Sequence, residues 1–522
     1  MDFVTSTISR RQSAGRVGQG TISLEPKRRQ RSVLRLCLLA IWLVINMDSS
    51  RSNTRSTSIH VLDDDSLLHV FYLLRPFWGD EDGSADWRYN GHWWYAFAHV
   101  CRRWRGVIFD SASYLGLSLF CTYGKPIADM LARSPPLPLV VDYFRDDREL
   151  TTEDEEGITL ALEQHGRVRR VRLQVGNAVT IMKDFLVAMD EEYPVLEFLY
   201  ISRRDEDNNS ILTFPETLQA PHLRHLTLTG FAFPTGSRLL TTAAGLVTLH
   251  LAMIHPSTYF HPNTLLRWIS LMPQLETLII YFTFSIPNRD VERELTLTPI
   301  TAPIMLPNLH QFRFRGVSTY LEALVNLITA PLLEKLRIEF FNRLTISSPR
   351  LLQFIDAAEN LRLDNAVLSF SDKSVAAGVG YNGTTKPEYA LGIVVNCWHL
   401  DWQVSSMAQI SNSLSQIFSA VEHLGLQHYV HSESSEEPYE VGRTEWHNLL
   451  MQFSNVKTLR IMNGLVNDLS RCLQLEDGEL PFELLPGLQE LEYFGSGDTG
   501  GAFTSFIDAR RNAGRPVTLV RL

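Results

Sequence analysis

Apolar residues recur along most of this chain in one short frame, apolar-x-x-apolar-x-apolar, where x is any residue. Between residues 168 and 333, successive frames begin 23 to 34 residues apart. Many frames follow a proline, such as Pro194, Pro221 or Pro273, which would punctuate the turn into a strand. The pattern predicts a series of short strands, and the frames begin at Val168, Leu196, Leu223, Leu246, Leu275, Leu309, Leu333, Val421, Val456 and Leu488.

Leucine-rich repeats show this frame with a period of about 20 to 29 residues. A single unit cannot bury its apolar side alone, so we expect stacked units of strand, loop and helix. The frame's leucines would lie between units, and the x positions would face outward along a concave parallel sheet. A faint unit at 360–363 and a strand at 391–395, separated by a Gly/Ser/Asn loop at about 371–388, count as degraded repeats of the array. We therefore predict an α/β class, with an irregular leucine-rich-repeat-like solenoid over 168–522 and a connecting segment and first cap over 111–167.

A different periodicity occupies residues 58–110. Leu67, Phe71 and Leu74 draw one helical stripe after three acidic residues, which suit the start of a helix. After a polar loop at about 76–91, a second stripe continues at steps of four, three, four and four through Trp93, Phe97, Val100, Trp104 and Ile108. The stripes predict two helices, at 62–74 and 93–108. The simplest interpretation is a small helical core in which Arg102, Arg103 and Arg105 are solvated.

Two stretches of this module resemble the two halves of the F-box, in the family's order. They are Leu62-Asp63-Asp64-Asp65 with Leu67-Leu68-His69-Val70-Phe71, and Val100-Cys101-Arg102-Arg103-Trp104. Asp63 stands where the family usually has proline, and the loop at 76–91 is longer than usual. The segments 120–126 and 134–139, and the closing segment 503–516, are similar to F-box proteins of mushroom-forming fungi.

The resemblance implies a function in protein ubiquitination. An F-box docks on a Skp-type adaptor and through it on a cullin, while the rest of the chain holds a target protein. The chain would then be a non-catalytic substrate receptor of a Skp-cullin-F-box E3 ubiquitin ligase. The apolar adaptor contacts implied are Leu62, Leu67, Leu68, Val70, Phe71, Val100, Cys101 and Trp104.

The composition indicates the class of protein and the compartment in which it works. The chain has 522 residues, of which 45% are hydrophobic and 20% charged, as in ordinary globular proteins. Its net charge of -10 makes the body a poor general nucleic-acid binder. Five cysteines lie far apart, without the spacing of a zinc site or a disulfide framework, which indicates the cytoplasm or nucleus.

The N-terminal segment 1–57 reads as a disordered basic tail, and Met47 is a candidate true start. The apolar run Leu36–Ile45 is too short for a stable membrane span, since a helix needs about 20 apolar residues to cross a bilayer. Its basic flank is typical of a signal peptide, but a small-residue cleavage site does not follow. We expect the run not to act as a signal.

Three features of the sequence could be sites of chemistry. Gly495–Gly500 fits the dinucleotide fingerprint formally, but the chain ends before the acidic residue that the fingerprint needs. His423, His428 and His431 lack the spacing of metal ligands. The acidic run at 146–147 and 153–156 reads as a solvated segment that caps the first helix of the array. We expect neither a catalytic site, nor a metal, nor a cofactor.

The repeats at 309 and 333 suggest a site for a partner. Their outward positions would bring four cations side by side on neighbouring strands, where they could bind a carboxylate or phosphate: Arg313, Arg315, Lys335 and Arg337. The plainer alternative is a set of ordinary surface charges. Two other functions remain beside the substrate receptor, namely a repeat scaffold without a ligase role and, more remotely, a nucleotide-binding enzyme that uses Gly495–Gly500.

Overall fold

The structure is a computed structural model of the chain. It divides into a first unit, Met1–Leu117, and a second unit, Ser118–Leu522. The description below covers residues 62–522 apart from 76–92, 145–149, 176–178, 204–211, 235, 255–258, 284–302, 342–348, 362, 382–388, 430–440, 463, 476–479, 481 and 495–500. The basic tail, the apolar run Leu36–Ile45 and the loop Gly495–Gly500 lie outside the described residues.

The described part of the first unit is helical. It contains α2 (Asp64–Leu74), α4 (Tyr95–Ala98), α5 (Arg102–Asp110) and α6 (Ala112–Leu115). The prediction of one helix over 93–108 is wrong, because the chain breaks between α4 and α5. Cys101 is extended there (φ -158°, ψ 169°), and its Sγ accepts a hydrogen bond from the Trp104 backbone nitrogen at 3.5 Å.

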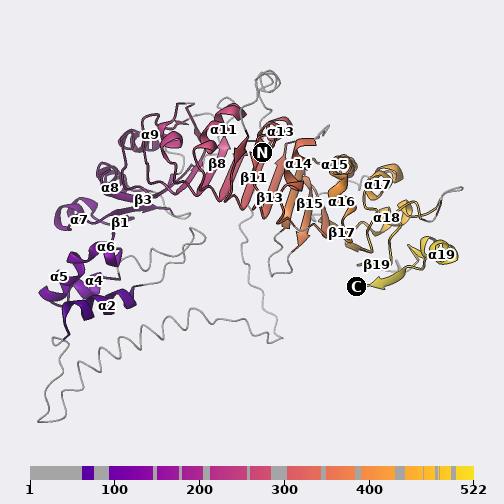
Figure 1. Cartoon of the computed structure of the whole chain (residues 1–522), viewed down its shortest axis with the longest axis horizontal. Coiled ribbons are helices and arrows are strands. Elements are labelled where there is room, and N and C mark those ends of the chain that lie inside the picture. Colours follow the sequence, from indigo (N-terminus) through magenta and orange to yellow (C-terminus); the bar gives the residue numbers. More distant parts are fainter. Residues whose placement is uncertain are drawn as a thin grey trace, which may run out of the picture. The chain divides into compact units, whose positions relative to one another are not determined.

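The second unit is built on a large, mostly parallel sheet (Figure 1). Sixteen strands of the described chain are joined in the order β1-β2-β3-β4-β6-β8-β9-β11-β13-β16-β15-β14-β17-β18-β19-β20. Their bounds are β1 Leu119–Thr122, β2 Leu139–Tyr143, β3 Val168–Val175, β4 Phe198–Arg203, β6 His225–Thr229, β8 Thr248–Ile254, β9 Thr277–Phe282, β11 Gln311–Gly316, β13 Lys335–Phe340, β14 Asn365–Ser371, β15 Ser374–Tyr381, β16 Tyr389–Asn396, β17 His423–Tyr429, β18 Thr458–Met462, β19 Glu490–Tyr493 and β20 Thr518–Arg521. Two-stranded pairs join β5 (Leu212–Thr213) to β7 (Phe231–Ala232), and β10 (Ile304–Met305) to β12 (Ile328–Thr329).

The predicted frames mark the strands. The frame at Val168 opens β3, and each of the others begins two residues before a strand. Neighbouring strands align the same frame position, so that Leu228 on β6 lies opposite Leu251 on β8, which lies opposite Ile280 on β9. These side chains are at most 1% exposed. Repetition of the frame thus becomes continuous apolar ladders across the sheet, which is the burial that one unit alone could not achieve.

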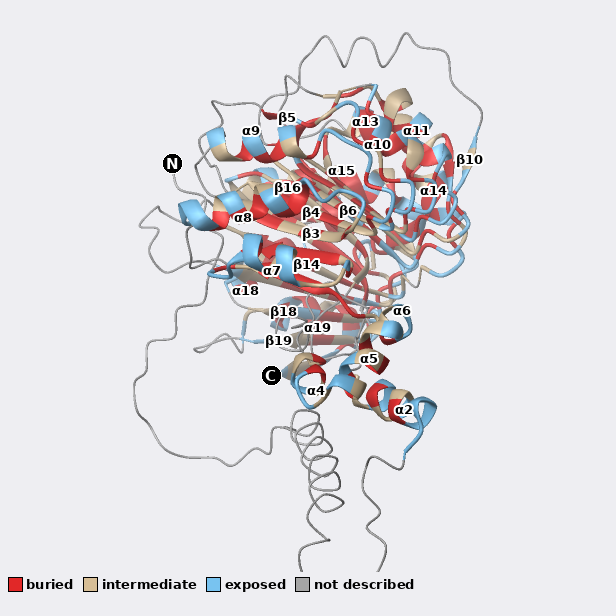
Figure 2. Cartoon of the chain, turned by 90° about the vertical axis from the view of Figure 1, so that its left-hand side faces the viewer, coloured by how far each residue is buried: buried red, intermediate tan, exposed pale blue. Residues whose placement is uncertain are grey.

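Helices cover one face of the sheet in the second unit (Figure 1). Their inner sides are buried and their outer sides exposed (Figure 2). Along each strand, every second side chain belongs to a buried ladder, and the side chains between them lie on the opposite face of the sheet. We call this opposite face the open face. The helices are α7 Ile127–Arg133, α8 Thr152–Leu162, α9 Val179–Ala188, α10 Arg238–Thr242, α11 Pro262–Ser270, α13 Ser318–Val325, α14 Pro349–Asp356, α15 Leu400–Ser413, α16 Ser415–Ser419, α17 Arg443–Leu450, α18 Val466–Cys472 and α19 Thr504–Asn512.

The sheet begins earlier than the first predicted frame. β1 and β2 pair in parallel within the segment 111–167, and β2 pairs with β3. Of the acidic run, residues 146–147 lie outside the described residues, and residues 153–156 are only partly solvated, contrary to expectation. Asp154 is 3% exposed, forms a capping box with Thr151 at the start of α8, and accepts a hydrogen bond from the Gly124 nitrogen at 2.8 Å. Fixed donors around a buried carboxylate replace the water it loses.

An antiparallel insertion interrupts the parallel order. β15 pairs antiparallel with β14 and with β16, whereas β13–β16 and β14–β17 are parallel. The prediction of a loop at 371–388 is therefore wrong for Ser374–Tyr381, which forms β15. Val375, Ala377 and Val379 alternate with smaller residues and are at most 1% exposed. Three apolar positions on one face suffice to anchor a central strand that has neighbours on both sides.

Among the described residues, none of the helices combines the length and apolar character required to cross a bilayer.

Candidate partner-binding surfaces

The entry into α2 is set by Asp63. Its carboxylate accepts a hydrogen bond from the Ser66 backbone nitrogen at 2.7 Å, which satisfies one of the free donors at the helix start. Hydrogen bonds from the side chain and backbone of Ser66 hold the pKa of Asp63 below its ordinary value. The residue that departs from the F-box pattern therefore performs a helix-entry role of its own, as an N-cap.

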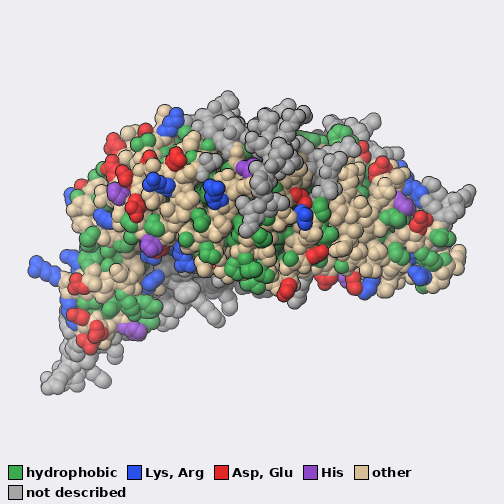
Figure 3. Space-filling model, turned by 45° about the horizontal axis from the view of Figure 1, so that its top comes forward, with side chains coloured by type: hydrophobic (Ala, Val, Ile, Leu, Met, Phe, Trp, Pro, Cys, Tyr) green, Lys and Arg blue, Asp and Glu red, His purple; other side chains and the backbone are tan. Residues whose placement is uncertain are grey.

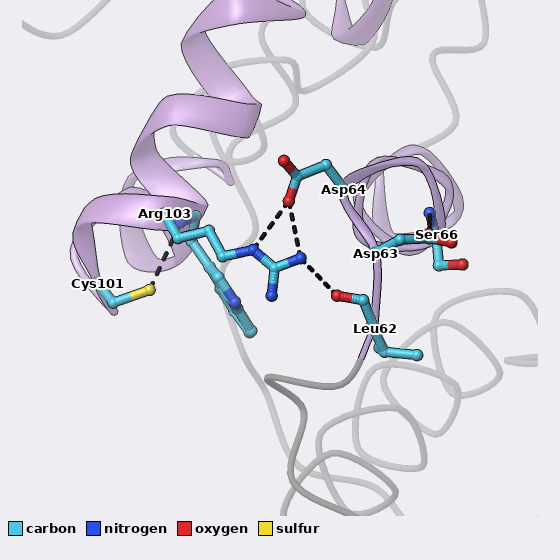
Figure 4. Close-up of polar contacts among 7 residues, drawn as sticks. Leu62, Asp63, Asp64, Ser66, Cys101 and Arg103 are labelled. Carbon is cyan, nitrogen blue, oxygen red and sulfur yellow. Dashed lines mark hydrogen bonds and ion pairs between the residues drawn. The ribbon is translucent and has the colours of Figure 1, made fainter.

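Arg103 links the two motif stretches (Figure 4). Its guanidinium lies 2.8 Å from the Asp64 carboxylate and also donates to the backbone carbonyl of Leu62. The expectation that Arg103 belongs to a solvated face is only partly right, because 35% of its side chain is exposed. The start of α5 is thus tied to the start of α2 by polar contacts.

Aromatic packing forms the core beneath this link. Phe71 lies edge-on to Trp104, with ring centroids 5.2 Å apart, and contacts Phe97 at 5.7 Å. Leu67, Phe71 and Trp104 are at most 5% exposed. These three expected adaptor contacts therefore hold the first unit together and present almost no surface to a partner. A helical stripe has the same spacing whether it faces its own core or another protein, so the sequence could not separate the two.

The other five expected contacts remain accessible to different degrees. Val100 is 59% exposed because the break between α4 and α5 takes it out of the apolar stripe. Leu62 is exposed, and Leu68, Val70 and Cys101 are half-buried. Exposed apolar side chains that the sequence reasoning missed are Leu73, at 68%, with Tyr72 and Tyr114, whose rings lie 5.1 Å apart. The run of apolar residues at 70–74 overfills a single helical stripe, which is the signal that could have found them.

The predicted basic patch lies on the open face of β11 and β13. Arg313 faces Arg337 across the strand pair, and Lys335 faces Gln311. The fourth cation is compensated, because Arg315 faces Glu339 and forms an ion pair with it at 3.2 Å. The sequence thus predicted the juxtaposition of the four cations, but not the ion pair that engages Arg315.

A hollow of about 260 Å³ adjoins these cations on the open face. It extends from β11 across the antiparallel insertion, and its lining includes Gly378, Gly392, Val367, Val394 and Ala376. The sequence reasoning missed it because part of its floor, on β15, belongs to the segment predicted as a loop.

Charges elsewhere are mixed. Over the side of the molecule seen in Figure 3, Lys and Arg side chains are interspersed with Asp and Glu. The net charge of -10 therefore does not gather there into one acidic surface.

The structure places two of the three histidines that are candidate metal ligands. His423 and His428 lie five residues apart on β17, and His431 lies outside the described residues. His423 is exposed, whereas burial lowers the pKa of His428. In the described chain, no three His, Cys, Asp or Glu residues form a group able to hold a metal ion.

The chain matches no family model, and no curated protein matches it significantly.

Proposed function

We propose that this chain is the substrate receptor of a Skp-cullin-F-box E3 ubiquitin ligase. The helical module of residues 58–110 would act as an F-box that binds a Skp-type adaptor and through it a cullin. The leucine-rich-repeat-like solenoid would bind a target protein, and the transfer of ubiquitin would fall to other subunits.

One observation carries the proposal. The two stretches that resemble the F-box pack on each other through Phe71 and Trp104, yet Leu62, Leu73 and Val100 stay exposed. Large apolar side chains exposed on so small a helical module are candidates for contact with a partner. Their exposure agrees with a helical module that binds a partner better than with a module that serves only as a core.

The second unit supports the other half of the proposal. The described helices cover one face of the sheet, and the open face carries half-buried and exposed side chains on strand after strand. Repeat proteins bind partners on extended surfaces of this kind. The described cysteines are all free thiols, which fits the cytoplasmic or nuclear setting that such a ligase requires.

The test is binding of the purified full chain to a purified Skp-type adaptor, measured by isothermal titration calorimetry. We expect Leu73→Asp with Val100→Asp to weaken binding at least tenfold, because two charges would be buried in the interface. The matched control is Val187→Asp on α9, a residue of the second unit that is 75% exposed. It should leave adaptor binding unchanged.

The proposal fails if the wild-type chain does not bind the adaptor, or if the double variant binds as tightly as wild type. In either case the repeat scaffold without a ligase role becomes the better description. Circular dichroism of each variant establishes that loss of binding does not reflect loss of the fold.

A further inference from the structure

The antiparallel insertion creates a shallow floor on the open face. Strand register aligns Arg313, Arg337, Gly392 and Gly378 in one row across β11, β13, β16 and β15. The row continues through Val367 on β14 to a third glycine, Gly425, on β17. Glycine has no side chain, so along this row the surface is open wherever no neighbouring side chain lies over a glycine.

Two of these glycines differ in what lies above them. A Cβ atom at Gly378 would meet the Tyr389 ring at 2.6 Å, so that ring already occupies the space. A Cβ atom at Gly392 would meet only the Cγ of Arg337, at 3.7 Å, which is an ordinary contact. The free space therefore lies over Gly392, directly beside Arg337.

The hollow combines an apolar lining with a cationic rim. Val367, Val394 and Ala376 supply apolar lining, and Arg313, Lys335 and Arg337 stand along one side. Arg337 is exposed, and in the part of the chain that the structure describes its guanidinium makes no ion pair or hydrogen bond.

The acidic residue on the same strand is already engaged. Glu339 forms its ion pair with Arg315 and accepts a hydrogen bond from the Asn396 side chain at 3.1 Å. Within the described chain, the partners of Glu339 are therefore Arg315 and Asn396, not Arg337.

We propose that this hollow receives a segment of a protein partner that carries an anionic group, carboxylate or phosphate, next to an apolar side chain. The apolar side chain sits over Gly392, and the anion takes charge-assisted hydrogen bonds from Arg337, reinforced by Arg313. A volume of about 260 Å³ is below the usual range of about 300–1,000 Å³ for small-molecule sites, and suits one large side chain. The inference rests on the proposed function only in taking the partner to be the ligase target.

The test is selection of a displayed library of random heptapeptides on the immobilised full chain. Enriched peptides are expected to share an acidic residue beside a large apolar one. Arg337→Gln, which removes the anion's partner, and Gly392→Val, which fills the floor, should each reduce binding of an enriched peptide at least tenfold. The matched control is Arg460→Gln on β18, which removes the same charge from an exposed open-face arginine that pairs with Glu492. It should change binding less than twofold.

Synthetic versions of the enriched peptide distinguish the source of the anion. Glutamate replaced by glutamine should abolish binding, and phosphoserine at that position shows whether phosphate binds more tightly than carboxylate. The inference is overturned if no peptide is enriched, if neutral or basic peptides are enriched, or if Arg337→Gln and Gly392→Val bind like wild type. Adaptor binding by the same preparations is scored separately, so that failure of the hollow and failure of the ligase proposal are distinguishable.

Discussion

The two units use regular apolar spacing in different ways. In the second unit, one frame repeats on many strands, and alternation along each strand decides which side chains are buried in the ladders and which face the open side. In the first unit, two short apolar helical stripes pack on each other at a single place, mainly through a few aromatic rings. Repetition makes burial predictable from sequence and spreads stability over many contacts, whereas a single meeting of two helices does neither.

The largest expected effect comes from removing an aromatic side chain in the first unit. Trp104→Ala deletes the ring that packs on Phe71 and should cost about 3–5 kcal/mol, most of the stability of a small module. We expect α2 and α5 to lose protection in hydrogen exchange while the strands of the second unit keep theirs.

The matched variant in the second unit is Phe314→Ala. Phe314 is fully buried against Phe282 and Tyr320, so the cost should be similar, about 3–5 kcal/mol. Because each ladder continues on both sides, exchange should rise near β11 without global unfolding. Unchanged protection of α2 in Trp104→Ala, or unfolding of the whole sheet in Phe314→Ala, would contradict the comparison.

The sequence predicted the frames, the buried ladders and the pairing of Arg313 with Arg337, because strand alternation ties each residue to a face. It missed β15 because its small and glycine residues resemble a loop, and only pairing on both sides makes it a strand. It also missed the break before Cys101, since the apolar steps continue through Val100 without interruption.

The candidate sites could also be predicted only as far as strand alternation determines them. The basic patch could be placed on neighbouring strands, but the ion pair of Arg315 with Glu339 depends on side-chain conformation. The hollow could not be predicted, because part of its lining lies on β15, a strand that the sequence did not indicate. In the first unit, the division of the expected contacts into buried and exposed ones depends on helix packing that spacing does not encode.

The largest effect of mildly acidic pH on stability is expected in the second unit. Burial, with a smaller contribution from Arg313, lowers the pKa of His250 to about 4, whereas an unfolded histidine has a pKa of about 6.5. The unfolded chain then takes up the proton first, so the free energy of unfolding falls as the pH drops from 6.5 to 4, by about 3 kcal/mol.

His250→Asn should remove the part of this slope that belongs to His250, while His428, whose pKa burial also lowers, keeps its own contribution. Chemical denaturation of wild type and variant at pH 7.5 and pH 4 measures the difference. The histidines described in the first unit, His69 and His99, are exposed, and their replacement is the control. A wild-type slope that survives in His250→Asn would assign the effect to another group.

The facing glycines of the insertion should respond in opposite directions. Gly378→Ala forces a Cβ atom to 2.6 Å from the Tyr389 ring and should destabilise the second unit by about 1–3 kcal/mol. Gly392→Ala meets only an ordinary contact and reduces the entropy of the unfolded chain, so it should be neutral or stabilising by up to about 1 kcal/mol. Thermal unfolding compares the two, and equal losses would show that the space over Gly392 is not free.

The smallest effect should come from the polar link of the first unit. Arg103→Met keeps the side-chain stem but removes the ion pair with Asp64 and the hydrogen bond to the Leu62 carbonyl. Water reaches both charged groups, which are 35% and 66% exposed, so the variant should lose only about 1 kcal/mol. Salt should weaken the wild type toward the variant, because it screens exposed pairs. A loss as large as that of Trp104→Ala, or one insensitive to salt, would mean that polar fixation of α5 on α2, rather than aromatic packing, holds the first unit together.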